Sequence, residues 1–203
     1  MTVKFGAILL AAGTSTRMGA ENKLLLPYRN VPIIRYMVNT YRAATGHTVC
    51  VITGHEAEQI ESALEGTDAV TIFNAGYANG QQSAVKLGLQ AAEDADALFI
   101  GLGDQPLITV KDLHFLMSAH HESGGTKISV PIQGEARGNP IIIPPNLREK
   151  VLKDPKGPGC KKFTRTRLEH VHHITTTRVS FFADIDTPQA YAMLCESQQE
   201  LTS

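Results

Sequence analysis

Residues 5–19 read Phe-Gly-Ala-Ile-Leu-Leu-Ala-Ala-Gly-Thr-Ser-Thr-Arg-Met-Gly, an apolar run that passes directly into small, hydroxylated and basic residues. An apolar run without polar alternation is typical of a strand that is covered on both faces, as in a parallel sheet. Open parallel sheets bind their ligands beyond the carboxyl ends of the strands. The stretch therefore predicts a buried strand over residues 3–11, followed by a ligand-binding loop.

Short apolar runs and amphipathic stretches alternate along the rest of the chain, and no internal repeat or linker interrupts them. The pattern favours an α/β fold, a Rossmann-like three-layer sandwich with a mostly parallel sheet, in one domain over residues 1–203. Residues 133–139 form either a hairpin or an excursion from the sheet, and Thr109 is a predicted helix N-cap. Strands are predicted over residues 48–52, 69–73, 97–102, 128–130, 140–143 and 180–184, and helices over 31–45, 56–65, 82–92, 109–121, 146–152, 160–170 and 187–199.

The composition excludes several classes of protein. The net charge of -1 provides no general attraction for nucleic acid, so an anionic ligand must be held locally. The cysteines, Cys50, Cys160 and Cys195, are odd in number and form no C-x-x-C pair, which indicates a reducing, cytoplasmic location without a disulfide framework or zinc ribbon. Residues 4–12 resemble a short signal peptide but lack a cleavage site, and no apolar run suits a membrane helix.

The loop after the first predicted strand has the composition of a triphosphate-binding loop. Gly13 and Gly19 allow close backbone approach and positive φ, while hydroxyl and N–H groups can surround phosphate oxygens. Arg17 adds a fork of donors, and Lys23 is near enough to reach the same phosphates. The loop matches neither the Walker A nor the G-x-G-x-x-G pattern. The alternative interpretation of the loop is an ordinary glycine-rich turn, and the alternative for Lys23 is a lysine on the protein surface.

Three further loops follow predicted strands. Asp104, in residues 101–106, suits Mg²⁺, which takes one or two carboxylates together with substrate phosphates; a turn-forming aspartate is the alternative. Asp184 and Asp186 lie on the same side of an extended segment, where either one also suits a helix N-cap. Residues 74–83 lead into a helix N-terminus, which attracts anions.

Taken in order, four motifs carry a family resemblance: Leu10-Ala11-Ala12-Gly13-x-Ser15-x-Arg17-Met18-Gly19 with Lys23-Leu24-Leu25, Gly103-Asp104-Gln105-Pro106, Arg137-Gly138-Asn139-Pro140, and Asp184-Ile185-Asp186-Thr187-Pro188. Over nearly the whole chain the sequence resembles the MobA-like nucleotidyltransferases, and among them most the molybdenum cofactor cytidylyltransferases. The resemblance implies the fold of the nucleotide-diphospho-sugar transferases. It also implies a Mg-dependent reaction in which the terminal phosphate of molybdopterin attacks the α-phosphorus of a nucleoside triphosphate and releases pyrophosphate.

The resemblance also implies the roles of individual residues. Catalysis would rest on Arg17, Lys23 and Asp104, with Mg²⁺, or Mn²⁺ as an alternative, on Asp104 and Asp186. The nucleotide would be bound by Leu10, Ala11, Ala12, Gly13, Arg17, Lys23, Asn74, Gly80, Ser83 and Asp104, and the acceptor by Gln81, Arg137, Asn139 and Lys161. The expected partners are the nucleotide, molybdopterin, and transiently a molybdoenzyme or its maturation chaperone.

Two positions bear on the choice of nucleotide. Guanylyltransferases of this group usually have Gly at the position of Ala12 and Cys at that of Gly103, so the resemblance favours CTP over GTP. The chain departs from the family pattern at Gly80-Gln81-Gln82-Ser83 and at residues 156–161, where Lys161 keeps the basic character but the acidic residue is replaced. These departures concern the acceptor contacts more than the nucleotide contacts.

Two clusters of residues, one basic and one of histidines, also need an interpretation. The basic run between Lys150 and Arg167 is either a solvated helix face or a contact for the pterin phosphate or a partner. A metal site is disfavoured at residues 170–173 and 120–121, since no Cys or carboxylate accompanies these histidines at ligand spacing.

Two other functions compete with that of a cytidylyltransferase: a guanylyl- or sugar-phosphate nucleotidyltransferase and a non-enzymatic delivery chaperone. A carrier needs no triphosphate and metal site, so Arg17, Lys23 and Asp104 argue against it.

Overall fold

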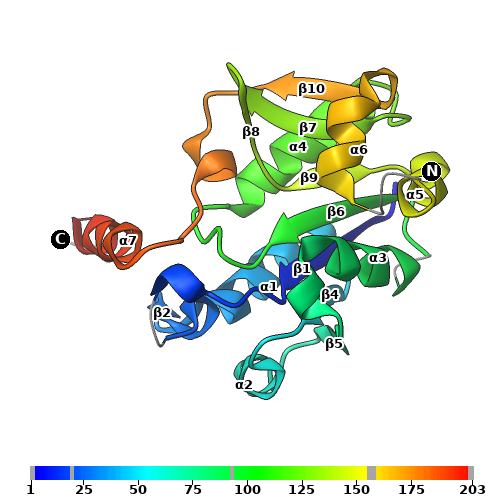
Figure 1. Cartoon of the computed structure of the whole chain (residues 1–203). Helices are drawn as coiled ribbons and strands as arrows, with labels where there is room; N and C mark the ends of the chain where they lie inside the picture. Colours follow the sequence, from blue (N-terminus) through cyan, green and yellow to red (C-terminus); the bar gives the residue numbers. More distant parts are fainter. Residues whose placement is uncertain (1–2, 19–20, 92–93, 155–158, 201–203) are drawn as a thin grey trace.

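The computed structural model describes residues 3–18, 21–91, 94–154 and 159–200. An eight-stranded sheet crosses the molecule in the order β10-β7-β9-β6-β1-β4-β5, with β8 paired to β7 (Figure 1). Its strands are β1 (Phe5–Ala11), β4 (Val49–Thr53), β5 (Val70–Phe73), β6 (Ala97–Leu102), β7 (Ile128–Gln133), β8 (Ala136–Arg137), β9 (Ile141–Ile143) and β10 (Val171–Thr175). A separate hairpin pairs β2 (Pro27–Tyr28) with β3 (Val31–Pro32).

Most of the sheet is parallel, because β1 pairs in parallel with β4 and β6, β4 with β5, and β7 with β10. The antiparallel pairings are those of β9 with β6 and β7, and of β8 with β7. The predicted fold class is thus confirmed. The segment at residues 133–139, left open between two alternatives, is a hairpin that turns at Gly134, whose φ is 59°.

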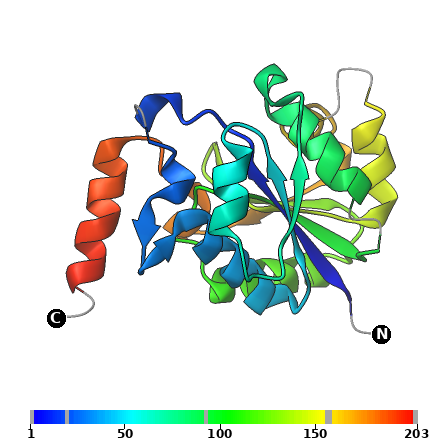
Figure 2. The ribbon, with the colours of Figure 1, turned by 90° about the horizontal axis from the view of Figure 1, so that it is seen from below.

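Helices cover both faces of the sheet (Figure 2). On one face lie α1 (Ile33–Thr45) and α4 (Val110–Glu122), and on the other α3 (Gln81–Ala91), α5 (Pro145–Leu152) and α6 (Cys160–Thr166). Along β1, Ala7 and Leu9 pack into the first layer while Ile8 and Leu10 pack into the second. This alternation within an entirely apolar run is what a strand buried on both faces requires.

Two shorter features complete the molecule. Helix α2 (Ala57–Ala63) buries Ile60 near α1, and α7 (Pro188–Glu200) lies beside the β2–β3 hairpin, where Tyr191 donates a hydrogen bond to the Pro27 carbonyl at 2.7 Å. The predicted cap of α4 is present as a capping box between Thr109 and Asp112. None of the helices in the described part of the chain is long and apolar enough to cross a membrane.

Three predicted elements differ from the structure. Residues 180–184 form no strand; a 3-10 turn, η5 (Val179–Phe182), buries Phe181, whose carbonyl accepts a hydrogen bond from Asn139 instead of a strand partner. The predicted helix 160–170 ends at Thr166, and the chain then turns into β10, which was not predicted. Helix α1 begins at Ile33, because residues 31–32 pair in the hairpin and Pro32 has extended dihedrals.

Candidate active site

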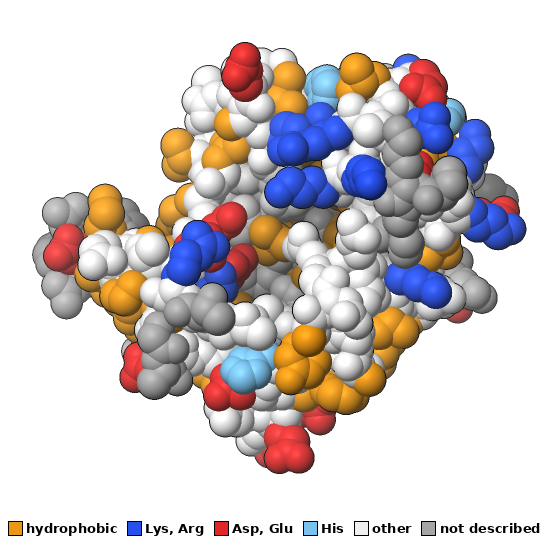
Figure 3. All heavy atoms as spheres, viewed as in Figure 1, with side chains coloured by type: hydrophobic (Ala, Val, Ile, Leu, Met, Phe, Trp, Pro, Cys, Tyr) orange, Lys and Arg blue, Asp and Glu red, His pale blue; other side chains and the backbone are white. Residues whose placement is uncertain are grey.

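Two adjoining cavities open at the carboxyl ends of β1 and β6 and appear as a hollow in the surface (Figure 3). The first cavity, of about 410 Å³, lies between the loop that follows β1 and the start of α3. The second, of about 600 Å³, extends toward β8 and α6. The residues common to both are Leu10, Arg17, Lys23, Gln81, Leu102, Asp104 and Asp186. A ligand in one cavity therefore meets a ligand in the other at this shared boundary.

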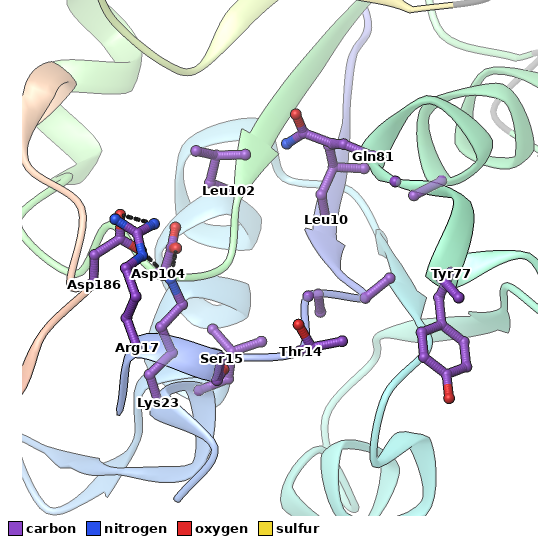
Figure 4. Close-up of a pocket in the computed structure, with 17 residues that line it drawn as sticks. Leu10, Thr14, Ser15, Arg17, Lys23, Tyr77, Gln81, Leu102, Asp104 and Asp186 are labelled. Atoms are coloured by element: carbon purple, nitrogen blue, oxygen red, sulfur yellow. Dashed lines mark hydrogen bonds and ion pairs between the residues drawn. The ribbon is translucent and has the colours of Figure 1, made fainter. Parts of the chain in front are cut away.

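The loop after β1 forms the floor of the first cavity (Figure 4). Ala11, Ala12, Gly13, Thr14 and Ser15 all line the cavity. The loop turns at Ser15, which has a φ of 48° and whose carbonyl accepts a hydrogen bond from the Met18 N–H at 2.8 Å. The positive φ thus falls on Ser15 rather than on Gly13, whose Cβ position is open space; Gly19 lies outside the described residues.

Four charged side chains lie at the shared boundary (Figure 4). Lys23 Nζ donates to Asp104 Oδ2 and, at 2.6 Å, to Asp186 Oδ1. Arg17 reaches the other oxygen of Asp186 at 2.7 Å. Lys23 is 12% exposed, whereas Arg17 is 69% exposed. The buried lysine therefore links the two carboxylates, and the exposed arginine contacts Asp186 alone.

Burial and ion pairing shift the pKa values of Lys23 and Asp186 in opposite directions. Burial lowers the pKa of Lys23, but the charges and hydrogen bonds of Asp104 and Asp186 outweigh burial, so that the pKa is raised. Burial likewise raises the pKa of Asp186, but Lys23 and Arg17 hold it below its usual value. Both shifts favour the charged forms of Lys23 and Asp186.

Backbone contacts bring the two carboxylates together. Gly103 N–H donates to the Leu10 carbonyl at 3.1 Å, which fixes the loop of Asp104 to the end of β1. A Cβ on Gly103 would lie 3.3 Å from that carbonyl oxygen, so the close approach favours glycine. Ile185 N–H donates to the Asp104 carbonyl at 2.9 Å, and Asp186 follows directly. Asp184, in the second cavity, accepts a hydrogen bond from buried Gln105 at 2.7 Å.

The donor set fits a hard divalent cation. The second oxygen of Asp104, Oδ1, is buried and has no hydrogen-bond partner within the described residues. In the same part of the chain no group of three or more His, Cys, Asp and Glu side chains is placed to hold a metal ion. A pair of carboxylates is what Mg²⁺ takes when substrate phosphates complete its coordination. The histidines at residues 120–121 and 170–173 form no such group.

Four of the predicted residues lie in the segment before α3 or in the first turn of that helix, and they occupy different places. Gly80 and Gln81 line the cavities, whereas Asn74 and Ser83 line neither of them. Asn74 is 2% exposed; it donates to Ser83 Oγ at 2.8 Å and accepts from the Gly76 N–H at 3.1 Å. Ser83 Oγ also donates to the Gly80 carbonyl at 3.0 Å. Asn74 and Ser83 thus hold the shape of the loop.

The residues expected to bind the acceptor all line the second cavity: Gln81, Arg137, Asn139 and Lys161. The cavity is also lined by Thr164, by Asp184, and by Lys162 and Arg165 of the basic run, for which a contact with the pterin phosphate was one of the two alternatives. The basic run between Lys150 and Arg167 is divided, because Lys150, Lys153 and Arg167 line a separate cavity of about 480 Å³; Lys156 lies outside the described residues. In the sequence, the i, i+4 spacing of Lys161 and Arg165 was the signal that the two side chains share one face of a helix.

Comparison with known proteins identifies the family. A family model described as a MobA-like NTP transferase domain matches residues 7–173. A protein named nicotine blue oxidoreductase, from Paenarthrobacter nicotinovorans, is 27% identical over 92% of this chain and 95% of its own. A bifunctional GlmU protein from Rubrobacter xylanophilus is 32% identical over 58% of this chain, which spans only 25% of that protein's length.

Solved structures show the same fold. A nucleotidyl transferase from Methanothermobacter thermautotroptrophicus superposes with a TM-score of 0.81 at 21% identity, covering 98% of this chain and 99% of the other. The Rv0371c protein of Mycobacterium tuberculosis, in complex with manganese, has a TM-score of 0.68 at 22% identity, covering 96% and 99%. A relative with this fold therefore binds a divalent metal ion.

Proposed function

The chain belongs to the family of MobA-like NTP transferase domains, a nucleotidyltransferase family, and from this premise we propose that it transfers CMP from CTP to the terminal phosphate of a molybdopterin-type cofactor. The observation that carries the proposal is the cluster of Arg17, Lys23, Asp104 and Asp186 at the boundary of two cavities. With the nucleotide in the first cavity and the acceptor in the second, the reacting phosphates meet at this cluster.

The reaction needs positioning and neutralisation of charge more than a protein nucleophile. A phosphate oxygen of the acceptor forms a bond to the α-phosphorus of CTP. The bond from that phosphorus to the oxygen bridging to the β-phosphate breaks, and pyrophosphate leaves with the electron pair. The backbone and hydroxyl groups of residues 11–15 orient the phosphates, while Arg17 and Lys23 neutralise them, in a site where preorganised charges are most effective.

Asp104 and Asp186 would hold Mg²⁺, or Mn²⁺ in its place, and the bound ion would supply charge neutralisation on the triphosphate. The buried, unpartnered oxygen of Asp104 supports this assignment. In the structure Lys23 occupies both carboxylates, so we expect it to move from the carboxylates to the phosphates when the nucleotide binds. Within the proposed mechanism, Lys23 therefore has a different partner in the free and the occupied site.

The wall beside Ala12 supports CTP as the nucleotide. A Cβ placed on Gly54 would lie 2.8 Å from the Ala12 methyl and 2.6 Å from Tyr77 Cβ, so both side chains lie close against the backbone of Gly54. Ala12 and Tyr77 both line the first cavity. Because Ala12 carries a methyl where glycine would leave more space beside the base, the smaller pyrimidine is favoured over guanine. The discrimination expected from such a contact is about 10- to 200-fold.

The name of the Paenarthrobacter relative suggests a second candidate function, oxidation or reduction of an organic substrate. A pair of carboxylates beside two cations suits a metal ion and a triphosphate, as transfer chemistry needs, and is not required for hydride transfer. The chain also lacks the G-x-G-x-x-G fingerprint of dinucleotide-binding enzymes. Assays for substrate-dependent oxidation of reduced nicotinamide or flavin cofactors, run beside the transfer assay, distinguish the two functions.

The proposed function is tested by ligand-dependent stability and by turnover. Mg²⁺ with CTP should raise the melting temperature more than Mg²⁺ with GTP, since a ligand that binds only the folded state stabilises by RT ln(1 + [L]/Kd). Pyrophosphate release from CTP should then depend on the molybdopterin acceptor. Stabilisation by GTP alone, or release only with a sugar phosphate, would assign the site to another nucleotidyltransferase. Binding of the cofactor without any nucleotide dependence would indicate a carrier.

Asp104→Asn is the first variant to examine. It keeps the shape of the side chain but removes a charge needed for the metal and for Lys23, so we expect the transfer rate to fall at least about a hundredfold. The matched control is Asp68→Asn, which removes an exposed surface carboxylate paired with Arg42. Equal rates in Asp104→Asn and the wild type would exclude Asp104 from the metal site.

A further inference from the structure

Four cationic side chains border the second cavity on the side of β8 and α6: Arg137, Lys161, Lys162 and Arg165. We call these four residues the cationic rim. In the space-filling view, Lys and Arg side chains gather above the hollow, while a second group, mixed with carboxylates, lies at its left edge (Figure 3). The two groups thus border different sides of the same hollow.

The local structure of α6 directs the rim toward the cavity. Cys160, Phe163 and Thr164 are buried at i, i+3 and i+4, and they fix the helix against the sheet. Thr164 Oγ1 also donates to the Cys160 carbonyl at 2.8 Å. Lys161 and Arg165, one turn apart, therefore share a face of the helix that borders the cavity.

Arg137 is fixed from the neighbouring hairpin. Its guanidinium donates to the Thr164 carbonyl at 3.4 Å and contacts His173 Nε2 at 3.3 Å. Burial lowers the pKa of Arg137, and the positive charge of Arg165 lowers it further. Two guanidinium groups thus lie close enough to repel each other, an arrangement that an anion between them would relieve.

The positive side chains on the two sides of the hollow differ in whether they form ion pairs with carboxylates. Arg17 and Lys23 form ion pairs with Asp104 and Asp186. In the described part of the chain, by contrast, no salt bridge involves Arg137, Lys161 or Arg165. Asp104, Asp184 and Asp186 also line the second cavity, but in the described residues none of them forms a salt bridge with Arg137, Lys161 or Arg165, so the excess of positive charge lies at the rim.

We propose that the cationic rim is an anion site of its own, which takes an anionic group of the acceptor other than the phosphate that attacks. The inference rests on the proposed function, since it assumes that the attacking phosphate lies at the Lys23 end of the cavity. The cavity of about 600 Å³ is large enough for a drug-sized molecule and far larger than a phosphate needs. The acceptor is therefore a molecule with at least two anionic groups, one at each end of the cavity.

The probe is inorganic phosphate, titrated calorimetrically into the full chain after the first cavity has been filled with Mg²⁺ and a CTP analogue bearing a methylene bridge between the α- and β-phosphorus. We expect phosphate to bind to this loaded protein. Arg165→Gln should raise its Kd about fivefold, and Arg137→Gln with Arg165→Gln more than tenfold, because each charge-assisted hydrogen bond contributes on this scale. Lys150→Gln, a cation that lines the separate cavity, should leave the Kd within twofold of the wild type.

The outcomes separate this proposal from the proposed function. Absence of phosphate binding to the loaded wild type, or the same Kd in Arg165→Gln as in the wild type, overturns the anion site. Arg165 is exposed, so its substitution tests the site even if the double variant fails to fold. Failure of the CTP analogue to bind counts against the proposed function alone, and the same variants, titrated without nucleotide, then decide on the rim.

Discussion

Lys23 lies between two carboxylates that come from distant parts of the chain, Asp104 and Asp186. A lysine in this position compensates the charge of a site in which a metal ion and a triphosphate would later add charges of both signs. It also competes directly with any cation for the same oxygens. The residue therefore acts in two ways in the proposed mechanism, as a partner of the phosphates in the occupied site and as a substitute for the metal in the free site.

Lys23→Gln should separate these two roles. Without nucleotide, Mn²⁺ should bind the variant roughly fivefold or more tightly than the wild type, because a positive charge a few ångströms from the ion opposes binding by at least about 1 kcal/mol. The transfer rate should fall, since the phosphates lose a buried cation. The Mn²⁺ affinity is measured by electron paramagnetic resonance, and turnover by pyrophosphate release.

Arg17→Gln is the matched control for this experiment. Arg17 contacts one oxygen of Asp186 from an exposed position, where solvent screens the interaction. Its substitution should change the affinity of the free protein for Mn²⁺ much less than Lys23→Gln does. Weaker or unchanged Mn²⁺ binding in Lys23→Gln would show that the lysine does not compete with the metal.

At the scale of elements, α4 and β7 are joined by a buried histidine. His120 is 3% exposed, and its Nδ1 lies 2.8 Å from Ser129 Oγ. Burial, together with the charges of His172 and His121, lowers the pKa of His120 to about 4. The buried position between helix and strand therefore favours the neutral ring.

This pKa predicts the acid sensitivity of the fold. A histidine in the unfolded chain has a pKa near 6.5, so below that pH the unfolded state binds the proton more readily than the native state. The stabilisation is complete above about pH 6.5 and is lost as the pH falls toward 4, by up to about 3 kcal/mol. His120→Gln should reduce the difference in urea unfolding free energy between pH 7 and pH 4.5.

The control is His47→Gln, which removes an exposed histidine and should leave the pH dependence as in the wild type. The comparison uses the pH difference within each protein, because His120→Gln also loses the contact with Ser129 and can be less stable at every pH. An unchanged pH difference in His120→Gln would show that another group controls acid unfolding.

Elements with strong local signals agreed with their predictions, and those that depend on distant partners did not. The apolar run of β1 and the capping box of α4 are encoded within a few residues. In the strand β10, by contrast, only Val171 and Ile174 are buried among polar neighbours, and its existence depends on pairing with β7. Phe181 and Phe182 look locally like a strand, but they lie in a 3-10 turn and pair with none of the strands in the described residues.

At the scale of the molecule, the site depends on a segment near the end of the chain. Phe181 is fully buried, and its ring centroid lies 6.3 Å from that of Phe115 on α4. The Phe181 carbonyl accepts hydrogen bonds from the Asn139 N–H at 2.9 Å and from Gln105 Nε2 at 3.4 Å. This anchor holds the segment that carries Asp184 and Asp186 against the loop of Asp104.

Phe181→Ala should therefore affect both stability and ligand binding. We expect a loss of about 3–5 kcal/mol in the free energy of unfolding, typical of deleting a buried phenyl ring. The affinity for Mg²⁺ with the CTP analogue should fall as well, because Asp186 is no longer held beside Asp104. Urea denaturation and calorimetry measure the two effects. Phe182→Ala, at a half-buried neighbour, should have a smaller effect on both; equal effects would mean that Phe181 is no special anchor.

The sequence by itself determined the fold class, the family and the kinds of residue at the site, because these depend on local patterns: a buried strand, the loop that follows it, and carboxylates at strand ends. Tertiary structure alone decided that Lys23 links Asp104 to Asp186, which lie 81 and 163 positions away, and that Asn74 and Ser83 shape a loop outside the cavities. It also gathered the cationic rim from a hairpin and a helix. Such groupings depend on which segments pack side by side, and spacing along one chain does not encode distances between segments brought together only by burial of a common core.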